Sequence, residues 1–224
     1  MKKFFQELDV IVAEGWDTIK KGQYWNYCMK NKVPLELYQL VMLQIYHYTK
    51  YNSINQAATV ACVEPGNIAL LKFVYKHAQE ELGHEGMVIH DLKSISAMPK
   101  EIMDPLAPTQ ALIAYLNNVA VRLGPIPRLG YSYWAEDAYD HIQEMLNKFR
   151  TDFKLDNNNM TFFVAHSSID EKHSAEVKAI MEKVIKTDED KKKVKEVANV
   201  TLYLTGQLLE ESFNEYMRSQ NKKK

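Results

Sequence analysis

Apolar side chains recur along most of this chain at the three- and four-residue spacings of an α-helix. The first segment shows the pattern, with Phe4, Leu8, Val12 and Trp16 on one face. Similar segments predict seven helices, at residues 2–20, 35–62, 67–95, 110–122, 128–153, 160–186 and 188–218. Gly, Pro and short polar clusters separate them, and no segment alternates as a half-buried strand does. The pattern therefore predicts an all-α fold, in which a single seven-helix bundle buries the apolar faces.

Length and composition favour one domain. The chain has 224 residues, of which 46% are hydrophobic, so we expect a single helical domain over residues 1–224 with a disordered tail at 219–224. The net charge of −1 gives no electrostatic attraction for nucleic acid or an anionic membrane, and we expect neither as a partner.

The expected location is the cytoplasm. No apolar run reaches the ~20 residues of a membrane span, and the N-terminal residues do not form a signal peptide. Cys28 and Cys62 form no CxxC pair or disulfide framework, which fits free thiols in a reducing compartment.

Two of the predicted helices carry histidines and a carboxylate on one face. These residues are His77, Glu81 and His84 in one helix, and His166, Asp170 and His173 in the other. Side chains three, four or seven positions apart lie on the same side of a helix. Imidazole with carboxylate suits Fe, Mn, Co or Zn, and paired carboxylate-x-x-His motifs hold two metals inside helical bundles. One such motif alone is more often a solvated ion pair, but its duplication favours a metal site.

Further ligands are expected from other helices. Glu136 lies among aromatic and apolar residues in GYSYWAEDAYDH, which favours an inward-facing ligand over a hydrogen-bonded buried carboxylate. Asp140, one turn later, is the substitute candidate. His47 lies in an apolar segment and is a candidate for the core or for the same cavity.

Some polar residues near these positions have two interpretations. His77 is as well suited to a place behind the ligands or against a substrate as to ligation. Asp91 follows His84 by seven residues, so it either orients that imidazole or is a solvated carboxylate. We expect His90 and His141 to be surface or salt-bridging histidines.

The combination of Glu81-x-x-His84, Glu136 in LGYSYWAE, and His166-x-x-x-Asp170-x-x-His173 resembles the heme-oxygenase-like diiron oxidases and oxygenases over nearly the whole chain. The wider superfamily also includes the thiaminase-II and pyrroloquinoline-quinone-synthase branches, which lack a dinuclear site. The resemblance implies a metal-ligand set of Glu81, His84, Glu136, His166, Asp170 and His173. One iron takes Glu81 and His84, the other takes histidines and Asp170 of the last motif, and Glu136 bridges them or lies nearby. His77 is an additional histidine beside this set.

The resemblance further implies an O2-dependent non-heme diiron oxidoreductase. Two iron ions, cycling between Fe2+ and Fe3+, would be its cofactors and O2 its cosubstrate. Its substrate would be a small molecule such as a fatty acid, an amino acid or an amine, and an external electron donor is an expected partner. A homodimer is expected because twofold dimers are the commonest assembly.

Three other functions stay open at this point. An iron-binding protein without an organic substrate would pair the same ligands with a closed pocket that holds only ions. A metal-free enzyme of the thiaminase-II or pyrroloquinoline-quinone-synthase type needs a catalytic cysteine or a cofactor pocket, and no clear base lies near Cys28 or Cys62. Heme binding through His47 or another histidine is disfavoured by so many carboxylates.

Overall fold

The computed structural model describes residues 1–223, without the side chains of residues 168–172. Its α-helices are α1 (Lys2–Lys21), α2 (Gln23–Lys30), α3 (Leu35–Ala58), α4 (Ile68–Glu80), α5 (His84–Ser94), α6 (Ala107–Asn118), α7 (Pro125–Ala135), α8 (Ala138–Phe153), α9 (Thr161–Val184) and α10 (Asp188–Lys222). A 3-10 helix, η1 (Thr59–Cys62), follows α3, and a π-helix, η2 (Val119–Leu123), follows α6. The described residues include no strand, so the all-α prediction is confirmed.

The predicted number of seven helices is wrong, because two predicted helices are broken and an extra one forms. The predicted helix 67–95 is divided into α4 and α5, with Gly83 at φ +90° between them. The predicted helix 128–153 is divided at Glu136 into α7 and α8. Residues 23–30, which lie between the first two predicted helices, form α2 and bury Tyr24 and Trp25.

The C-terminal end also differs from the expectation. α10 continues through Lys222, so residues 219–222 are helical where a disordered tail was predicted. Lys224, the end of that predicted tail, lies outside the described residues.

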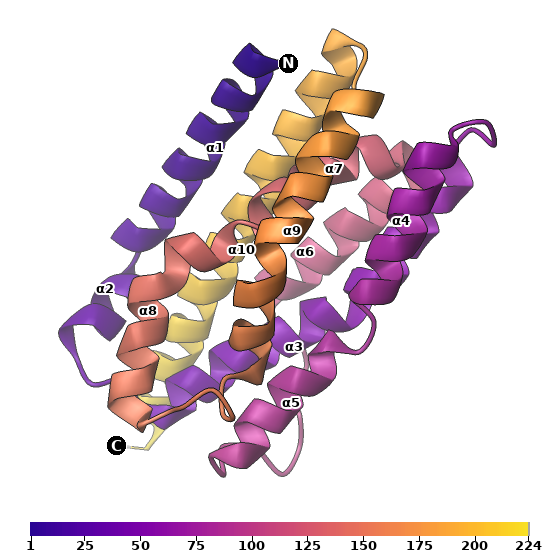
Figure 1. Cartoon of the computed structure of the whole chain (residues 1–224). Helices are drawn as coiled ribbons and strands as arrows, with labels where there is room; N and C mark the ends of the chain where they lie inside the picture. Colours follow the sequence, from indigo (N-terminus) through magenta and orange to yellow (C-terminus); the bar gives the residue numbers. More distant parts are fainter. Residues whose placement is uncertain (224) are drawn as a thin grey trace.

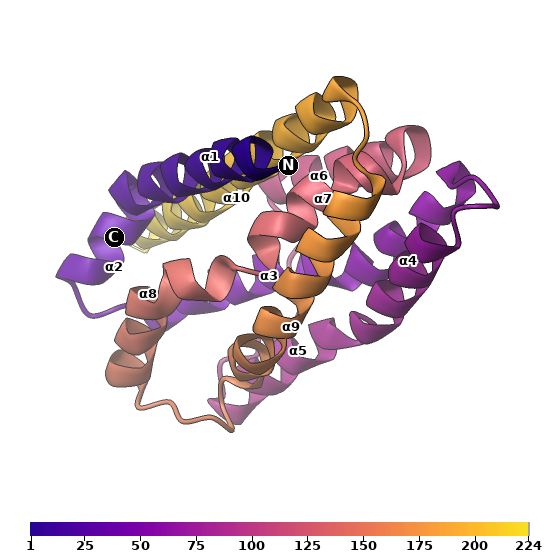
Figure 2. The same ribbon diagram turned by 45° about the horizontal axis from the view of Figure 1, so that its top comes forward.

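The helices enclose one continuous apolar core. Figure 1 shows α1 beside α10 on one side of the bundle, and α4 and α5 on the other. In both Figure 1 and Figure 2, α9 runs between α8 and the α4–α5 pair, and it contacts α4, α5, α7 and α8. α7 packs against α10 so closely that a Cβ at Gly130 would lie 2.1 Å from the carbonyl oxygen of Val194. Only glycine fits at this crossing, which holds α7 in place at the centre of the bundle.

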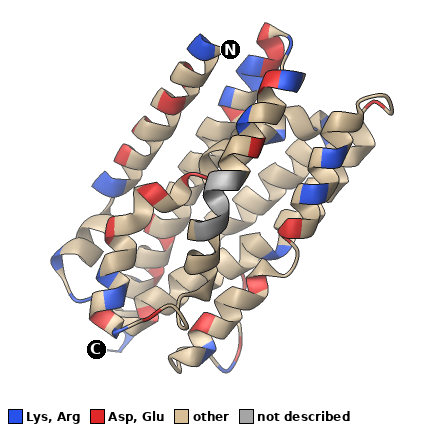
Figure 3. Cartoon of the chain, in the orientation of Figure 1, with Lys and Arg blue, Asp and Glu red and all other residues tan. Residues whose placement is uncertain are grey.

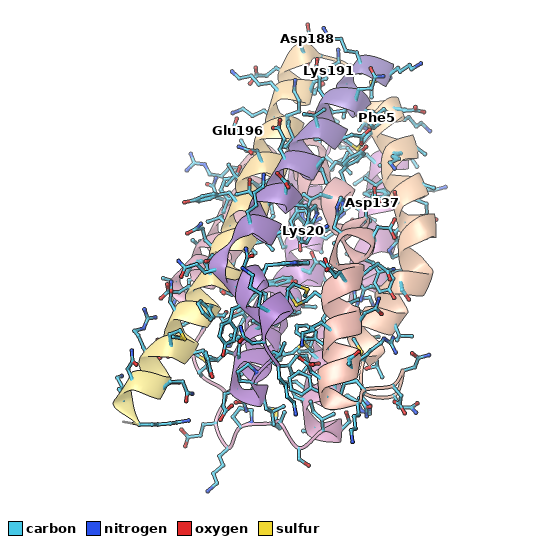
Figure 4. The ribbon with its side chains drawn as sticks, turned by 90° about the vertical axis from the view of Figure 1, so that its left-hand side faces the viewer. Phe5, Lys20, Asp137, Asp188, Lys191 and Glu196 are labelled. Carbon is cyan, nitrogen blue, oxygen red and sulfur yellow. The ribbon has the colours of Figure 1, made fainter. Side chains whose placement is uncertain are left out.

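Charged residues follow the outer faces of the helices. Acidic and basic residues are interspersed along them (Figure 3), in agreement with the net charge of −1. α10 begins with a capping box, in which the Thr187 hydroxyl accepts a hydrogen bond from the Asp190 backbone N–H and the Asp190 carboxylate accepts one from the Thr187 N–H. Asp188 and Lys191, an ion pair at 2.8 Å, lie at this end of the bundle (Figure 4). None of the described helices combines the length and the hydrophobicity that crossing a membrane would require.

Candidate metal centre

The residues of the candidate site lie at helix breaks and on α9. Glu81 is the C-cap residue that directly follows α4, and His84 is the first residue of α5. Gly83 between them adopts the left-handed conformation, which glycine reaches without a steric penalty. This turn exposes Leu82 to 70% while Glu81 and His84 stay buried. The two side chains remain neighbours, at 3.5 Å between Glu81 Oε2 and His84 Nδ1, although no continuous helix joins them.

A first group of side chains surrounds Glu136, the C-cap residue of α7. His77 Nε2–H donates to Glu136 Oε1 at 2.9 Å, and His173 Nδ1–H donates to Glu136 Oε2 at 3.2 Å. Glu81 completes this group, in which one potential ligand atom from each of the four buried residues lies within 4.8 Å of the others. α4, α7 and α9 therefore meet at one point inside the bundle.

A second group consists of Glu81, His84 and His166, whose potential ligand atoms also lie within 4.8 Å of one another. Glu81 belongs to both groups, so it is the carboxylate that lies between two potential metal positions. The resemblance implied that Glu136 either bridges the two metals or lies nearby. It had not assigned the two α9 histidines, and the structure places His166 with His84 and places His173 with Glu136.

The carboxylates are ionised in this arrangement. Burial by itself would raise the pKa of Glu136, but the hydrogen bonds from His173 and His77 outweigh it and hold that pKa at about 2. Burial also opposes ionisation of Glu81, yet the contact with His84 leaves its pKa below the usual value. The same contacts raise the pKa of His173, through Glu136, and the pKa of His84, through Glu81. In the chain without a metal, the carboxylates therefore favour the protonated form of these two imidazoles.

His166 is held in the form that a metal requires. Its Nδ1–H donates to the Phe162 carbonyl at 2.6 Å, which leaves Nε2 as the nitrogen with a free lone pair. Burial lowers the pKa of His166, so the ring is neutral. A hydrogen bond from the outer nitrogen to a backbone carbonyl is the usual support of a metal-bound histidine.

The buried polar atoms fit a divalent cation. His77 Nδ1 is buried and has no hydrogen-bond partner among the described residues, while the buried His84 Nδ1 has only the 3.5 Å ion-pair contact with Glu81. Buried polar nitrogens without a partner are uncommon, and a bound metal ion is one of the explanations that such atoms call for. Four imidazoles and two carboxylates in two groups match the ligand chemistry of iron, manganese or zinc.

Five of the six predicted ligands therefore lie close together in the structure. Glu81, His84, Glu136, His166 and His173 meet in the two groups, together with His77. Asp170 lies outside the described residues, because its side chain is among those of 168–172.

Comparison with known proteins defines the family. Residues 39–206 match the family model described as iron-containing redox enzyme. The chain belongs to this family. No protein of curated function matches it in sequence. The predicted resemblance to heme-oxygenase-like iron enzymes is confirmed at the level of family and fold.

Solved structures show how widely this fold is shared. A domain of unknown function with a heme oxygenase-like fold from Shewanella denitrificans OS217 is 36% identical, with a TM-score of 0.93, over 96% of this chain and 94% of that one. A TenA homologue from P. horikoshii OT3 is 13% identical, with a TM-score of 0.72, over 94% of this chain and 98% of that one. A TenA homologue from Pseudomonas syringae pv. tomato is 9% identical, with a TM-score of 0.76, over 94% and 93%. The two TenA likenesses concern the fold alone.

The family's helical frame places several predicted residues away from the metal centre. Asp140, the substitute candidate, is exposed on α8. His47 is half-buried and its Nε2 pairs with the Met103 carbonyl at 2.8 Å, so it does not face the cavity described below. His90 is exposed, as expected. His141 is half-buried and stacks on Trp16 at 5.3 Å between ring centres, so its predicted surface position is only partly right.

Asp91 has a role that differs from both predictions, which were orientation of the His84 imidazole and a solvated carboxylate. It is fully buried, so it is not a solvated carboxylate. Its Oδ1 accepts from the backbone N–H of Thr161 at 2.9 Å and its Oδ2 from that of Phe162 at 3.0 Å. Asp91 therefore caps the first turn of α9 from α5, where the helix dipole favours a negative charge. It orients the helix that carries His166 and His173 instead of orienting His84.

A cavity of about 180 Å³ opens from the candidate metal centre into the apolar part of the bundle. His77, Glu81, Glu136 and His166 form its polar end. The rest is lined mainly by aromatic and aliphatic side chains, among them Trp16, Met42, Ile45, Leu146, Phe149 and Phe162. Glu81 and Glu136 are the only carboxylates in this lining, which contains no lysine, arginine or cysteine from the described residues.

Sequence reasoning missed two residues beside the centre, Asn52 and Arg128. Asn52 Nδ2 donates to Glu81 Oε2 at 2.7 Å, and Arg128 Nη2 donates to Asn52 Oδ1 at 2.6 Å. A signal was present in the sequence, because Asn52 starts a polar run (NSINQ) within an apolar helix and Arg128 lies within the apolar GPIPRLGYSY. Polar residues at such positions indicate a buried network.

Proposed function

We propose that the chain is a non-heme diiron oxidase or oxygenase that uses O2 to oxidise a small organic substrate. The observation that carries this proposal is the connection between the His/Glu cluster and the apolar cavity. A site that only stored or bound iron would need no cavity of about 180 Å³ beside it. The family's description as iron-containing redox enzymes supports iron as the metal.

Each ligand would have a distinct place. His77, Glu136 and His173 would hold one iron, His84 and His166 the other, and Glu81 would contact both. Asp170, which lies between His166 and His173 in the sequence, remains a proposed ligand. When bound, the two irons would supply the electrons and the Lewis acidity for the reduction of O2. The aromatic walls of the cavity would exclude water from the reacting substrate.

A proton must leave His173 for this residue to bind metal, because a metal ligand is the neutral imidazole. His173 Nε2 lies 3.3 Å from Glu80 Oε2, whose side chain is 30% exposed. Glu80 would therefore accept or relay that proton at the edge of the site. Glu136, which stays ionised, would keep its contact with the ring during the transfer.

The cavity favours a substrate with one polar end. A charged group placed far from the metals would be buried without a partner, since no lysine or arginine of the described residues lines the walls. The polar end of the substrate would lie at the metals and its apolar part against residues such as Ile45, Leu146 and Phe149. Among fatty acids, amino acids and amines, this favours a fatty acid or an alkylamine.

The metal-free alternative requires a catalytic cysteine or a cofactor pocket, and neither cysteine is placed for catalysis at this site. Cys28 is buried outside the cavity lining, and burial raises the pKa of its thiol to about 12, so it is protonated at neutral pH. Cys62 is exposed and also lies outside this lining. A thiol nucleophile is therefore not available at the site.

Anaerobic reconstitution with Fe2+ tests the proposal. We expect two iron ions per chain and, after addition of O2, a transient absorption band in the visible region. Consumption of O2 should rise on addition of a matching fatty acid or alkylamine. A chain that takes up no iron, or that gives a Soret band with hemin in place of iron uptake, would sink the proposal.

A further inference from the structure

A buried arginine lies behind the metal centre without a carboxylate partner. Arg128 is 1% exposed, and no ion pair involves it among the described residues. Its guanidinium donates to neutral acceptors, namely Asn55 Oδ1 at 2.6 Å, Gln56 Oε1, Ser132 Oγ at 3.2 Å and Asn52 Oδ1 at 2.6 Å. The guanidinium also lies over the Tyr131 ring, at 5.4 Å from its centre. Buried charges are costly and are normally paired, so a buried cation whose hydrogen bonds go only to amides and a hydroxyl indicates a specific role.

Arg128 determines which way the Asn52 amide points. A guanidinium only donates hydrogen bonds, so the group of Asn52 that faces it must be the carbonyl oxygen. The Asn52 amide nitrogen then faces Glu81, to which it donates at 2.7 Å. The reverse orientation would place an N–H of Asn52 against an N–H of Arg128. The arginine thus sets a hydrogen-bond donor against Glu81, although it does not contact Glu81 itself.

Glu81 needs such external support. It ends α4 next to the left-handed turn at Gly83, so no following helical turn restricts its side chain. It is also the only residue common to the two groups of potential ligands, so a rotation of its carboxylate would disturb both. The bond from Asn52 occupies one lone pair of Oε2, and a carboxylate has about four lone-pair sites, so metal ligation remains compatible with it.

We propose that Arg128 is a positioning residue for the metal centre, which acts through the oriented amide of Asn52 to hold Glu81 between the two metal positions. This inference rests on the proposed function, since it assumes that the two groups bind metal. Outer partners of this kind alter metal affinity by roughly 10- to 100-fold when they are removed.

Two asparagines of α3 provide a matched comparison. Asn52 and Asn55 each accept a hydrogen bond from Arg128 at 2.6 Å, but only Asn52 contacts Glu81. Asn55 instead donates to Asn117 Oδ1 at 3.1 Å. Asn52→Leu therefore removes the donor from Glu81, whereas Asn55→Leu removes a similar bond of Arg128 and leaves the Glu81 donor in place.

The experiment titrates the full chain and both variants with Mn2+ alone, with electron paramagnetic resonance to distinguish a coupled pair from isolated ions. We expect Asn52→Leu to weaken binding about tenfold or more and to lose the coupled signal, while Asn55→Leu binds as the parent does within about threefold. Circular dichroism checks that each variant keeps its helix content. If Asn52→Leu does not fold, Asn52→Ser, which cannot reach both partners, carries the same comparison.

Two results would overturn the inference. Either Asn52→Leu binds Mn2+ as tightly as the parent, or Asn55→Leu weakens binding and loses the coupled signal as much as Asn52→Leu does. A parent chain that binds neither Mn2+ nor Fe2+ would instead refute the proposed function. The failure of the inference and the failure of the proposed function are therefore distinguishable, because the failure of the proposed function appears with the parent chain alone.

Discussion

The cap that Asp91 places on α9 should be among the most important polar interactions of the fold. Asp91→Asn keeps the size of the side chain but replaces one oxygen by an NH2 group. The remaining oxygen can serve the backbone N–H and the hydroxyl of Thr161, which now share Asp91 Oδ1 at 2.9 and 2.6 Å. The N–H of Phe162, at 3.0 Å from Oδ2, would then face another donor inside the protein.

The magnitude follows from these contacts. Loss of a hydrogen bond to a charged group costs about 1.5–3 kcal/mol, and loss of a negative charge at a helix N-terminus costs about 0.3–1 kcal/mol. We expect the free energy of unfolding to fall by roughly 2–4 kcal/mol. For a chain of this size that corresponds to a fall in Tm of roughly 5–15 °C.

Thermal and urea unfolding of the metal-free chain, followed by circular dichroism, measure this effect. Asp188→Asn is the matched control, because Asp188 lies in the first turn of α10 but its side chain is 98% exposed, and we expect little change there. The reasoning would be refuted if Asp91→Asn unfolded within about 0.5 kcal/mol of the parent, the usual range for a surface substitution. We also expect Asp91→Asn to weaken metal binding, since α9 carries His166 and His173.

Three further predictions concern the centre and the helices that frame it. Glu81→Ala or His173→Ala should each remove at least one metal per chain, measured by metal analysis, with unchanged helix content by circular dichroism; full occupancy in both would show that the ligand assignment is wrong. Gly83→Ala should destabilise the fold by roughly 1–2 kcal/mol because of its left-handed φ of +90°, whereas Gly86→Ala, in equally open space within α5, should stabilise it by roughly 0.5–1 kcal/mol in the same urea titration. Thr187→Ala should cost about 1 kcal/mol, since it removes the cap of α10, and an unchanged urea midpoint would contradict that role.

Much of the fold could be predicted from the sequence because helical periodicity reports burial directly. The apolar faces and the Pro and Gly positions located most helices. The His and Glu residues of α4, α5 and α9 were found by their spacing, and the family followed from those same residues. The break at Gly83 could not be predicted, because an isolated glycine inside a helical pattern is usually tolerated. Gly83, with a φ of +90°, lies between α4 and α5, both of which contact α9.

The polar residues behind the centre were harder to predict for another reason. Asp91, Asn52 and Arg128 each contact residues that are 29 or more positions away in the chain. Spacing within one helix carries no information about such partners. Asp91 lay on the expected face of α5 and was still assigned the wrong role, because its partner was the start of a helix about 70 residues later. Local patterns indicate which side chains turn inward, and tertiary contacts decide what they meet.

The position of the two carboxylates strengthens the case for a bound cation. Glu81 ends α4 and Glu136 ends α7, so each lies at the negative end of a helix dipole. A carboxylate is disfavoured there by about 0.3–1 kcal/mol, and both are also buried at 5% and 7% exposure. Local rules of this kind are broken mainly at functional sites, where another interaction compensates for the cost. His173 and His84 compensate in part, through a hydrogen bond from His173 Nδ1 to Glu136 and an ion-pair contact between His84 Nδ1 and Glu81. A pair of divalent ions between the helix ends would balance both carboxylates and both dipoles at once.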